Sequence, residues 1–87
     1  MSSFLFENLD IYKKSSDLCS KIIELCGGFP NGNYFLADQL KRASLSIVAN
    51  IAEGSGRWHN KDKKNFYYIS RGSLFECVAI LGICSKN

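Results

Sequence analysis

Three long stretches of the chain repeat apolar residues at intervals of three or four, which is the spacing of amphipathic α-helices. The first stretch ends at Gly27-Gly28, a helix-stop signal that Pro30 reinforces. Asn8 or Asp10 is the expected N-cap of this helix. The stripe expected to face the core comprises Ile11, Ser15, Leu18, Ile22 and Leu25, beside a second stripe of Tyr12, Cys19 and Cys26.

The second predicted helix spans residues 34–53 and has two contrasting faces. The apolar face carries Leu36, Leu40, Ala43, Ile47 and Ile51. The polar face carries Gln39, Arg42, Ser46, Asn50 and Glu53. Asn31 or Asn33 is expected to cap this helix, and Gly54 is expected to end it, with Gly56 as a second flexible point.

The third predicted helix spans residues 61–84, and Asn60 is its expected N-cap. Its apolar residues are Phe66, Ile69, Leu74, Cys77, Ile80, Leu81 and Cys84, and a short polar line comprises Ser70, Ser73 and Glu76. Through residues 79–84 this helix is apolar around much of its circumference, so three helices would leave part of it exposed. The sequence therefore predicts a contact with another chain or a missing partner helix.

Short connections between three amphipathic helices predict an all-α fold, an up-down antiparallel helical bundle that forms a single domain over residues 1–87. Phe29, in the first connection, is expected to pack under the end of the bundle. No apolar run approaches the roughly 20 residues that cross a bilayer, and the first ten residues lack the features of a signal peptide. We therefore expect a cytoplasmic protein with no membrane contact.

Charge is unevenly placed along the chain, whose net charge is +3. Residues 1–40 contain three basic and five acidic side chains, whereas residues 41–87 contain eight basic and three acidic ones. A basic half attracts nucleic acid or an acidic partner, although a plain solvated surface has the same composition.

The four cysteines form two pairs, each separated by seven residues. On a helix the two thiols of such a pair lie about 10.5 Å apart along the axis, too far for a disulfide. The spacing is also not that of a zinc site, and His59 has no ligand-spaced partner. We expect four buried, reduced thiols and neither metal nor other cofactor. Cross-helix bridges from Cys19 or Cys26 to Cys77 or Cys84 stay geometrically possible, but a reducing compartment disfavours them.

The turn Glu53-Gly54-Ser55-Gly56-Arg57 carries the glycines of a phosphate-binding loop. Such loops, however, need the backbone N–H groups of a helix N-terminus, and here the glycines follow a helix C-terminus. The segment is therefore expected to end the central helix and reverse the chain.

Two polar lines should then face each other. In an antiparallel pair that turns near residue 57, Arg42 comes level with Ser73 and Glu76, so we expect an Arg42–Glu76 ion pair between the helices. The polar network expected to fix register or assembly comprises Gln39, Arg42, Ser46, Asn50, Glu53, Ser73 and Glu76. An enzymatic alternative would use Glu53 and Glu76 as acid and base. No nucleophile, metal shell or substrate pocket accompanies them, so neither catalysis nor a small-molecule substrate is expected.

The second turn places an aromatic residue among cations, which suits phosphate contacts and base stacking. The candidate nucleic-acid surface comprises Lys41, Arg57, Trp58, Lys61, Lys63, Lys64 and Arg71. The alternative is a solvated turn with Trp58 packed on the end of the bundle.

Several strings of this sequence resemble the four helix bundle protein family, also called the 23S rRNA intervening-sequence protein family. The resemblance lies in Phe6-Glu7-Asn8-Leu9, Phe29-Pro30, Gln39-Leu40-Lys41-Arg42-Ala43, the run SIVANIAEG at residues 46–54 with Gly56-Arg57, and Gly72-Ser73-Leu74-Phe75-Glu76. Val48 stands where many relatives have proline, and Tyr12 replaces a frequent tryptophan. The family normally has a fourth helix after the third. We expect this sequence to be a truncated member, or one in which another subunit replaces that helix.

The resemblance implies an all-helical bundle that assembles into a closed pentameric ring and has no enzymatic activity. Relatives are encoded within inserts in ribosomal RNA genes. A related accessory protein of diversity-generating retroelements is a basic barrel that binds a reverse transcriptase and nucleic acid. We therefore expect a small homo-oligomeric assembly protein, or alternatively an accessory protein that binds RNA, DNA or a nucleic-acid-processing protein.

Overall fold

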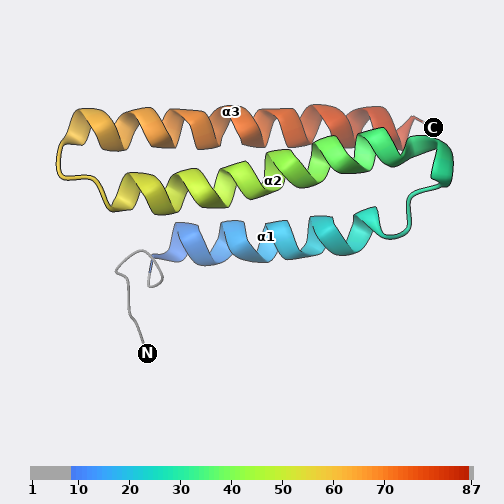
Figure 1. Ribbon diagram of the computed structural model, residues 1–87, viewed down its shortest axis with the longest axis horizontal. Helices are drawn as coiled ribbons and strands as arrows, with labels where there is room; N and C mark the ends of the chain where they lie inside the picture. Colours follow the sequence, from blue (N-terminus) through green and yellow to red (C-terminus); the bar gives the residue numbers. More distant parts are fainter. Residues whose placement is uncertain (1–8, 87) are drawn as a thin grey trace.

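The computed structural model describes residues 9–86, which form three long antiparallel helices (Figure 1). Helix α1 spans Asp10–Cys26, α2 spans Tyr34–Ser55 and α3 spans Asn60–Ser85, with a short 3₁₀ turn, η2, at Asn31–Asn33. The described residues contain no strand. The predicted all-α, up-down arrangement is thereby confirmed, and α3 sets the long dimension of a molecule that measures 44 × 30 × 17 Å.

The core lies along α2, which contacts both other helices. Its buried apolar residues are Ile22 and Cys26 of α1, Ala37, Leu40, Ala43, Ile47 and Ile51 of α2, and Cys77 and Ile80 of α3. Phe29 packs against this cluster from the first connection, as predicted. Three of the four cysteines are buried and Cys84 is half-buried, and all four are free thiols.

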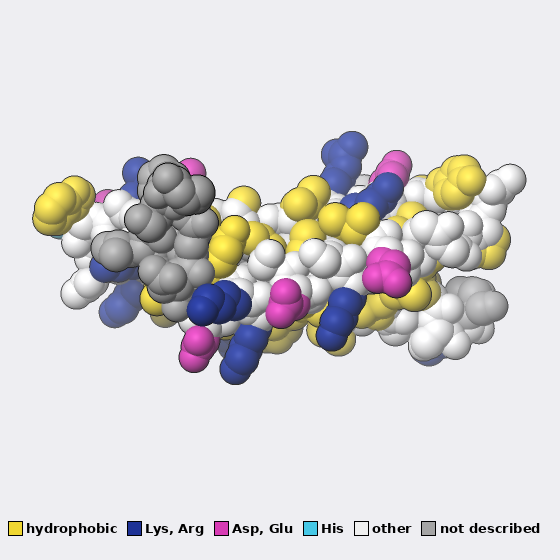
Figure 2. Space-filling model, turned by 90° about the horizontal axis from the view of Figure 1, so that it is seen from below, with side chains coloured by type: hydrophobic (Ala, Val, Ile, Leu, Met, Phe, Trp, Pro, Cys, Tyr) yellow, Lys and Arg dark blue, Asp and Glu magenta, His cyan; other side chains and the backbone are white. Residues whose placement is uncertain are grey.

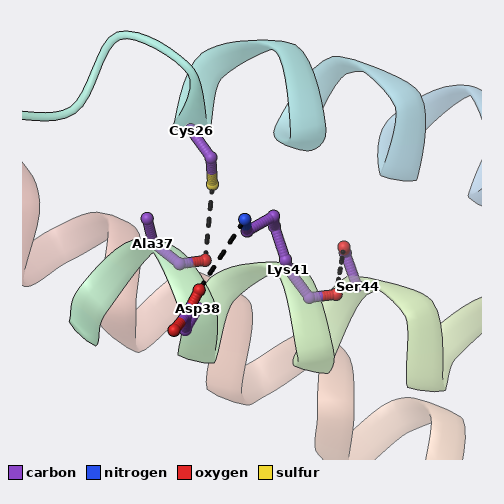
Figure 3. A network of polar contacts seen from close by, with 5 residues as sticks. All are labelled: Cys26, Ala37, Asp38, Lys41 and Ser44. Carbon is purple, nitrogen blue, oxygen red and sulfur yellow. Dashed lines mark hydrogen bonds and ion pairs between the residues drawn. The ribbon is translucent and has the colours of Figure 1, made fainter. Parts of the chain in front are cut away.

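Small side chains bring α1 close to α2 (Figure 3). The Cys26 thiol donates a hydrogen bond to the Ala37 carbonyl oxygen at 3.5 Å, and the Cys19 sulfur lies 3.5 Å from the Ser44 hydroxyl oxygen. The Ser44 hydroxyl donates to the Lys41 carbonyl oxygen at 2.9 Å. These buried polar groups are therefore satisfied inside the interface.

The face of α1 that contacts α2 differs from the predicted one. Ser15, Cys19, Ile22 and Cys26 are buried, whereas Ile11 and Leu25 are 57% and 51% exposed. The predicted stripe is wrong for Ile11, Leu18 and Leu25, because close helix packing selects the smaller serine and cysteine side chains. The larger aliphatic stripe is consequently rotated away from α2.

Gly54 does not end the central helix, contrary to the sequence prediction. α2 continues to Ser55, and Gly56 is its C-cap. A Cβ atom at Gly54 would lie 2.9 Å from Cε1 of Tyr67 and 3.1 Å from Cβ of Phe66. Glycine therefore stands here because α3 approaches the backbone of α2 closely, while the chain reversal falls at Gly56.

The predicted side-chain caps do not form in the described residues. Leu9, Asn33 and His59 occupy the three N-cap positions, and none makes a capping hydrogen bond. Asn33 thus has the predicted position without the predicted bond, while Asp10 and Asn60 are already the first residues of their helices. The alternative cap Asn8 lies outside the described residues.

α1 and α3 both lie against α2 but not against each other (Figure 1). No Cα atom of α1 comes within 8 Å of a Cα atom of α3. The three helices therefore form an open arrangement with α2 in the middle. Side chains that would meet in a closed bundle instead line a groove.

α3 is long and apolar enough to cross a bilayer by length and composition alone, and it is the one described helix that satisfies this criterion. Its mean hydropathy over 18 residues is 1.2, and 22% of that window is buried in the structure. This finding departs from the sequence expectation of no such segment, because α3 mixes small and weakly apolar residues among its larger ones.

Candidate functional site

An apolar groove opens between α1 and α3, with α2 as its floor. Its volume is about 450 Å³, and it is lined by Leu9, Ile11, Ile47, Ile51, Tyr67, Ser70, Arg71 and Leu74. Figure 2, which views the molecule from the α1 side, shows hydrophobic side chains exposed beside a row of charged ones. We call this cavity the α1–α3 groove.

The polar side chains of α3 that line the α1–α3 groove already make contacts within the chain. The Ser70 hydroxyl is buried and donates a 2.8 Å hydrogen bond to the Ile47 carbonyl oxygen. Arg71 is the charged residue in the lining, and its guanidinium lies 5.3 Å from the ring centroid of Phe75. The groove therefore offers apolar contact inside and positive charge at its edge.

A second cavity of about 320 Å³ opens near the other end of the molecule. It is lined by Leu25, Gly28, Phe29, Pro30, Asn33, Leu36 and Cys84. Neither cavity lining contains Glu53 or Glu76, the two carboxylates of the enzymatic alternative. Those two side chains therefore line neither of these two cavities.

A third apolar surface is the back face of α3, which we define as Tyr68, Phe75 and Ala79. All three are exposed. Helical periodicity places them away from Ser70, Cys77 and Ile80, the buried residues that contact α2. An amphipathic helix of an isolated bundle would carry polar residues in these positions.

The predicted polar network forms in part. The Ser73 hydroxyl donates to the Ser46 hydroxyl at 2.8 Å, and the Asn50 amide donates to the Ser46 carbonyl and hydroxyl oxygens at 2.8 and 3.1 Å. One residue further along α2, the Ile47 carbonyl oxygen accepts from Ser70, so α2 and α3 are in contact at both levels. Ser46, Asn50 and Ser73 are half-buried and form one connected set at the α2–α3 contact.

The remaining members of the predicted network do not join this set. Gln39, Arg42 and Glu76 are exposed, and the ion pairs among the described residues are Lys41–Asp38 and Arg57–Glu53. The predicted Arg42–Glu76 ion pair is therefore wrong. An ion pair between two exposed side chains gains little free energy, because both charges are already hydrated and both side chains would lose conformational freedom.

Glu53 instead holds Arg57 at the second turn. An Arg57 Nη atom lies 2.9 Å from a Glu53 carboxylate oxygen, and the guanidinium lies 4.6 Å from the ring centroid of Phe66. The arginine therefore lies in a fixed position along the α2–α3 turn. Part of its charge is balanced by Glu53.

The predicted nucleic-acid residues separate into three places. Arg57, Trp58, Lys61, Lys63 and Lys64 gather at the turn between α2 and α3 and the start of α3. Trp58 is 94% exposed, so the alternative of a tryptophan packed on the bundle is wrong.

The two other predicted residues lie elsewhere. Arg71 lines the α1–α3 groove. Lys41 lies about 24 Å along α2 from Arg57, where it pairs with Asp38 at 3.7 Å beside the end of α1 (Figure 3). Residues that are many turns apart on one helix cannot share a compact surface. The predicted nucleic-acid surface is therefore limited to the residues at the α2–α3 turn and the start of α3.

The buried thiols have altered acidity. Burial raises the pKa of the Cys77 thiol, and the nearby Glu76 carboxylate and Cys19 thiol raise it further. Burial likewise raises the pKa of Cys26, against a smaller lowering by Lys41. Raised values keep these thiols protonated and unreactive. Among residues 9–86 no group of three His, Cys, Asp or Glu side chains is placed to hold a metal ion.

The sequence prediction did not find the α1–α3 groove. Ile11 and Leu74 were assigned to the core, and Arg71 to a nucleic-acid surface. One feature of the sequence could have indicated the groove. Ile11, Leu18 and Leu25 repeat every seven residues and form an apolar flank of α1 that is distinct from the stripe with Cys19 and Cys26. Which stripe faces α2 depends on close packing, and sequence spacing alone does not determine it.

Comparison with known proteins identifies the family. No curated protein matches this chain. The family model described as 23S rRNA-intervening sequence protein matches residues 7–87, nearly the whole chain and all three helices. The chain therefore belongs to the 23S rRNA-intervening sequence protein family.

Proposed function

We propose that this protein is a non-enzymatic assembly subunit that associates with copies of itself through the back face of α3. The observation that carries the proposal is the exposure of Tyr68 and Phe75 on the side of α3 that contacts no other helix. Covering such side chains stabilises an assembly by about 25 cal/mol per Å² of apolar surface. The family resemblance favours a closed ring of five.

A membrane is a weaker explanation for the same apolar surface. Arg71 and Glu76 lie in the middle of the apolar part of α3. Each charged residue at the centre of a bilayer costs about 2.5–3.5 kcal/mol, whereas both side chains can stay solvated at the edge of a protein interface. Four free cysteines also fit a reducing, cytoplasmic setting.

The experiment that tests self-assembly is the mass in solution by light scattering at micromolar concentration. A ring of five 9.8 kDa chains would have a mass of about 49 kDa. We expect Phe75→Glu to reduce the mass to that of one chain, because the charge cannot be buried at an interface. The matched control is Leu45→Glu, since Leu45 is 53% exposed on α2 and Phe75 is 58% exposed. A monomeric wild-type chain would refute the proposal.

A second candidate function is nucleic-acid binding at the α2–α3 turn. The observation that favours it is Trp58, almost fully exposed among Arg57, Lys61 and Lys64. Exposed aromatic side chains stack on bases, and lysines contact phosphates.

Salt dependence and stacking separate this candidate from self-assembly. Binding of a fluorescent single-stranded RNA should weaken steeply between about 50 and 200 mM salt. Trp58→Ala should weaken it further, while Lys13→Ala on α1 should not. No anisotropy change even at the lowest salt concentration would exclude this function and leave self-assembly untouched.

A further inference from the structure

The cysteines of α1 and α3 lie in one core, against α2. Cys19 and Cys26 of α1 both contact groups of α2 through sulfur. Cys26 and Cys77 belong to the same buried cluster, and Cys84 packs against it. Because α1 and α3 run parallel and each pair is spaced by seven residues, Cys19 pairs with Cys77 in register, and Cys26 pairs with Cys84 (Figure 1).

Hydrogen bonds to α2 fix the level of the outer pair, Cys26 and Cys84. The Cys26 thiol donates to the Ala37 carbonyl oxygen, so these two residues are level. Ser73 of α3 is level with Ser46. Cys84 follows Ser73 by eleven residues, and α3 runs antiparallel to α2, so Cys84 comes within about one turn of Ala37. The two thiols therefore lie at nearly the same height along the bundle.

The second cavity brings the same helix ends together. Leu25 of α1, Leu36 of α2 and Cys84 of α3 line it. Burial raises the pKa of the Cys26 thiol, Lys41 lowers it and Cys84 raises it, so both side chains are close enough to act on this thiol. Cys84 is half-buried, so solvent reaches the pair through this cavity.

The spacing of the pair is too wide for a direct S–S bond. No Cα atom of α1 lies within 8 Å of a Cα atom of α3. A disulfide joins Cα atoms that are about 4.4–6.8 Å apart. Two metal–sulfur bonds of about 2.3 Å, the length in zinc thiolates, hold the sulfur atoms up to about 4.6 Å apart, against about 2 Å in a disulfide. An ion between the sulfurs therefore spans a distance that a disulfide does not.

Two thiols in an apolar setting select a soft cation that is satisfied by two ligands. Structural zinc takes four ligands, and among residues 9–86 no group of three His, Cys, Asp or Glu side chains is placed to hold a metal ion. Calcium and magnesium require several oxygen ligands. Monovalent copper prefers sulfur and forms linear complexes with two thiolates. The cysteine spacing that argues against zinc therefore does not argue against monovalent copper.

We propose that Cys26 and Cys84 bind one monovalent copper ion between them as a two-coordinate dithiolate. Both thiol protons pass to solvent, two sulfur–copper bonds form, and the copper stays monovalent. The thiol of Cys26 gives up its hydrogen bond to α2 in this step. The complex carries one excess negative charge, and Figure 3 shows the Lys41 ammonium on the side of α2 that faces Cys26, where it also pairs with Asp38 at 3.7 Å.

The inner pair, Cys19 and Cys77, is a comparison within the same chain. Its spacing and register match those of the outer pair, but both of its thiols are buried. Burial raises the pKa of Cys77, and the neighbouring Glu76 carboxylate raises it further. A carboxylate this close opposes an anionic copper complex, so the inner pair should bind copper less tightly than the outer pair.

Anaerobic titration of the reduced full chain with monovalent copper tests the proposal, with bicinchoninate as the competing chelator. We expect one ion per chain to be withheld from the chelator, and X-ray absorption at copper to show two sulfur neighbours. Cys84→Ala should weaken binding by more than about 100-fold, since even changes beyond the ligands cost about 10–100-fold. Cys19→Ala is the matched control and should keep the ion. Far-UV circular dichroism of each variant checks that the helices are intact.

A second variant leaves both ligands in place. Lys41→Glu reverses the charge beside the outer pair and should weaken copper binding several-fold. Lys13→Glu makes the same change about 20 Å away along α1 and should not.

Several outcomes would overturn the inference. One is that no ion is withheld from the chelator, and another is that Cys84→Ala keeps it. Loss of the ion in Cys19→Ala alone would assign it to the inner pair instead. Three or more sulfur neighbours, or a mass that rises with copper, would place the ion in a cluster or between chains. Phe75→Glu should bind copper as the wild-type chain does, so this inference and the proposed self-assembly fail separately.

Discussion

Gly54 shows how one residue determines the distance between two helices. Because it lacks a Cβ atom, Tyr67 and Phe66 of α3 can lie directly on the α2 backbone. Gly54→Ala would place a methyl group 2.9 Å from the Tyr67 ring and 3.1 Å from Cβ of Phe66, so the ring or the α3 backbone must shift. We expect a loss of about 1–3 kcal/mol in the free energy of unfolding, measured by urea denaturation.

Gly72→Ala is the matched control for that measurement. Gly72 lies inside α3, and a Cβ atom there meets nothing within 4 Å. Alanine in an open helical position should stabilise the chain by about 0.5–1 kcal/mol, because the unfolded state loses conformational freedom. If both variants changed stability in the same direction, the close-approach explanation of Gly54 would be wrong.

The buried thiols predict a pH dependence. Burial raises the folded-state pKa of Cys26 and Cys77 above the ordinary 9.0. Below pH 9 both thiols are protonated in the folded and unfolded chains, so their contribution is fully present. As the pH rises past 9 the unfolded chain loses these protons first, and stability falls until the folded thiols also titrate.

Urea midpoints between pH 7 and 10.5 would measure this fall. The Cys26→Ala, Cys77→Ala double variant should be less stable at pH 7 but should lose less stability between pH 9 and 10.5. The Cys84→Ala variant is the control, because that thiol is only half-buried. The prediction would be contradicted if the urea midpoints of the wild-type chain, the double variant and Cys84→Ala fell in parallel as the pH rises.

At the scale of elements, the α2–α3 contact depends on two serines of unequal importance. Ser70 is buried and donates to the Ile47 carbonyl oxygen, whereas Ser73 is half-buried and donates to Ser46, which also accepts from Asn50. Ser70→Ala should therefore cost about 1 kcal/mol in the free energy of unfolding, and Ser73→Ala less. Equal losses in thermal or urea unfolding would mean that burial does not distinguish these bonds.

Helix positions could be predicted from this sequence, but their rotation could not. Apolar periodicity and the stop at Gly27-Gly28 placed α1 and α3 within a residue or two of their observed ends. Periodicity does not, however, decide which of two adjacent stripes meets a neighbour. The small stripe with Cys19 and Cys26 packs on α2, and the aliphatic stripe with Ile11 faces the groove. Sequence spacing also cannot distinguish a glycine that ends a helix from one, such as Gly54, that leaves room for an aromatic side chain of a neighbouring helix.

For the candidate site, the sequence could predict which polar residues lie close together on one helix. It could not predict which residues of different helices are in contact. Ser46, Asn50 and Ser73, three of the seven residues of the predicted network, are hydrogen-bonded to one another, and each polar line is visible along its own helix. The Arg42–Glu76 pair and the position of Lys41 were wrong. Each needed the axial offset and rotation of two helices, which arise from packing over the whole interface.

At the scale of the whole molecule, three helices leave more apolar surface exposed than a small domain can easily tolerate. Domains of this size are marginally stable because they bury a small fraction of their surface. Here α1 and α3 do not cover each other, and the back face of α3 is open. The stability of the fold is therefore expected to depend on partners.

Self-assembly makes that dependence measurable, because mass action links stability to concentration. For an oligomer that unfolds as it dissociates, a tenfold rise in concentration adds about 1 kcal/mol per chain, or about 4–8 °C in the melting temperature of a chain this short. Calorimetry at 10 and 100 μM should show this shift for the wild-type chain and for Leu45→Glu. Phe75→Glu should melt at one temperature at both concentrations, since a monomer has no mass-action term. A concentration-independent wild-type melting temperature would instead mean that the three helices are stable alone, with the back face of α3 exposed to water.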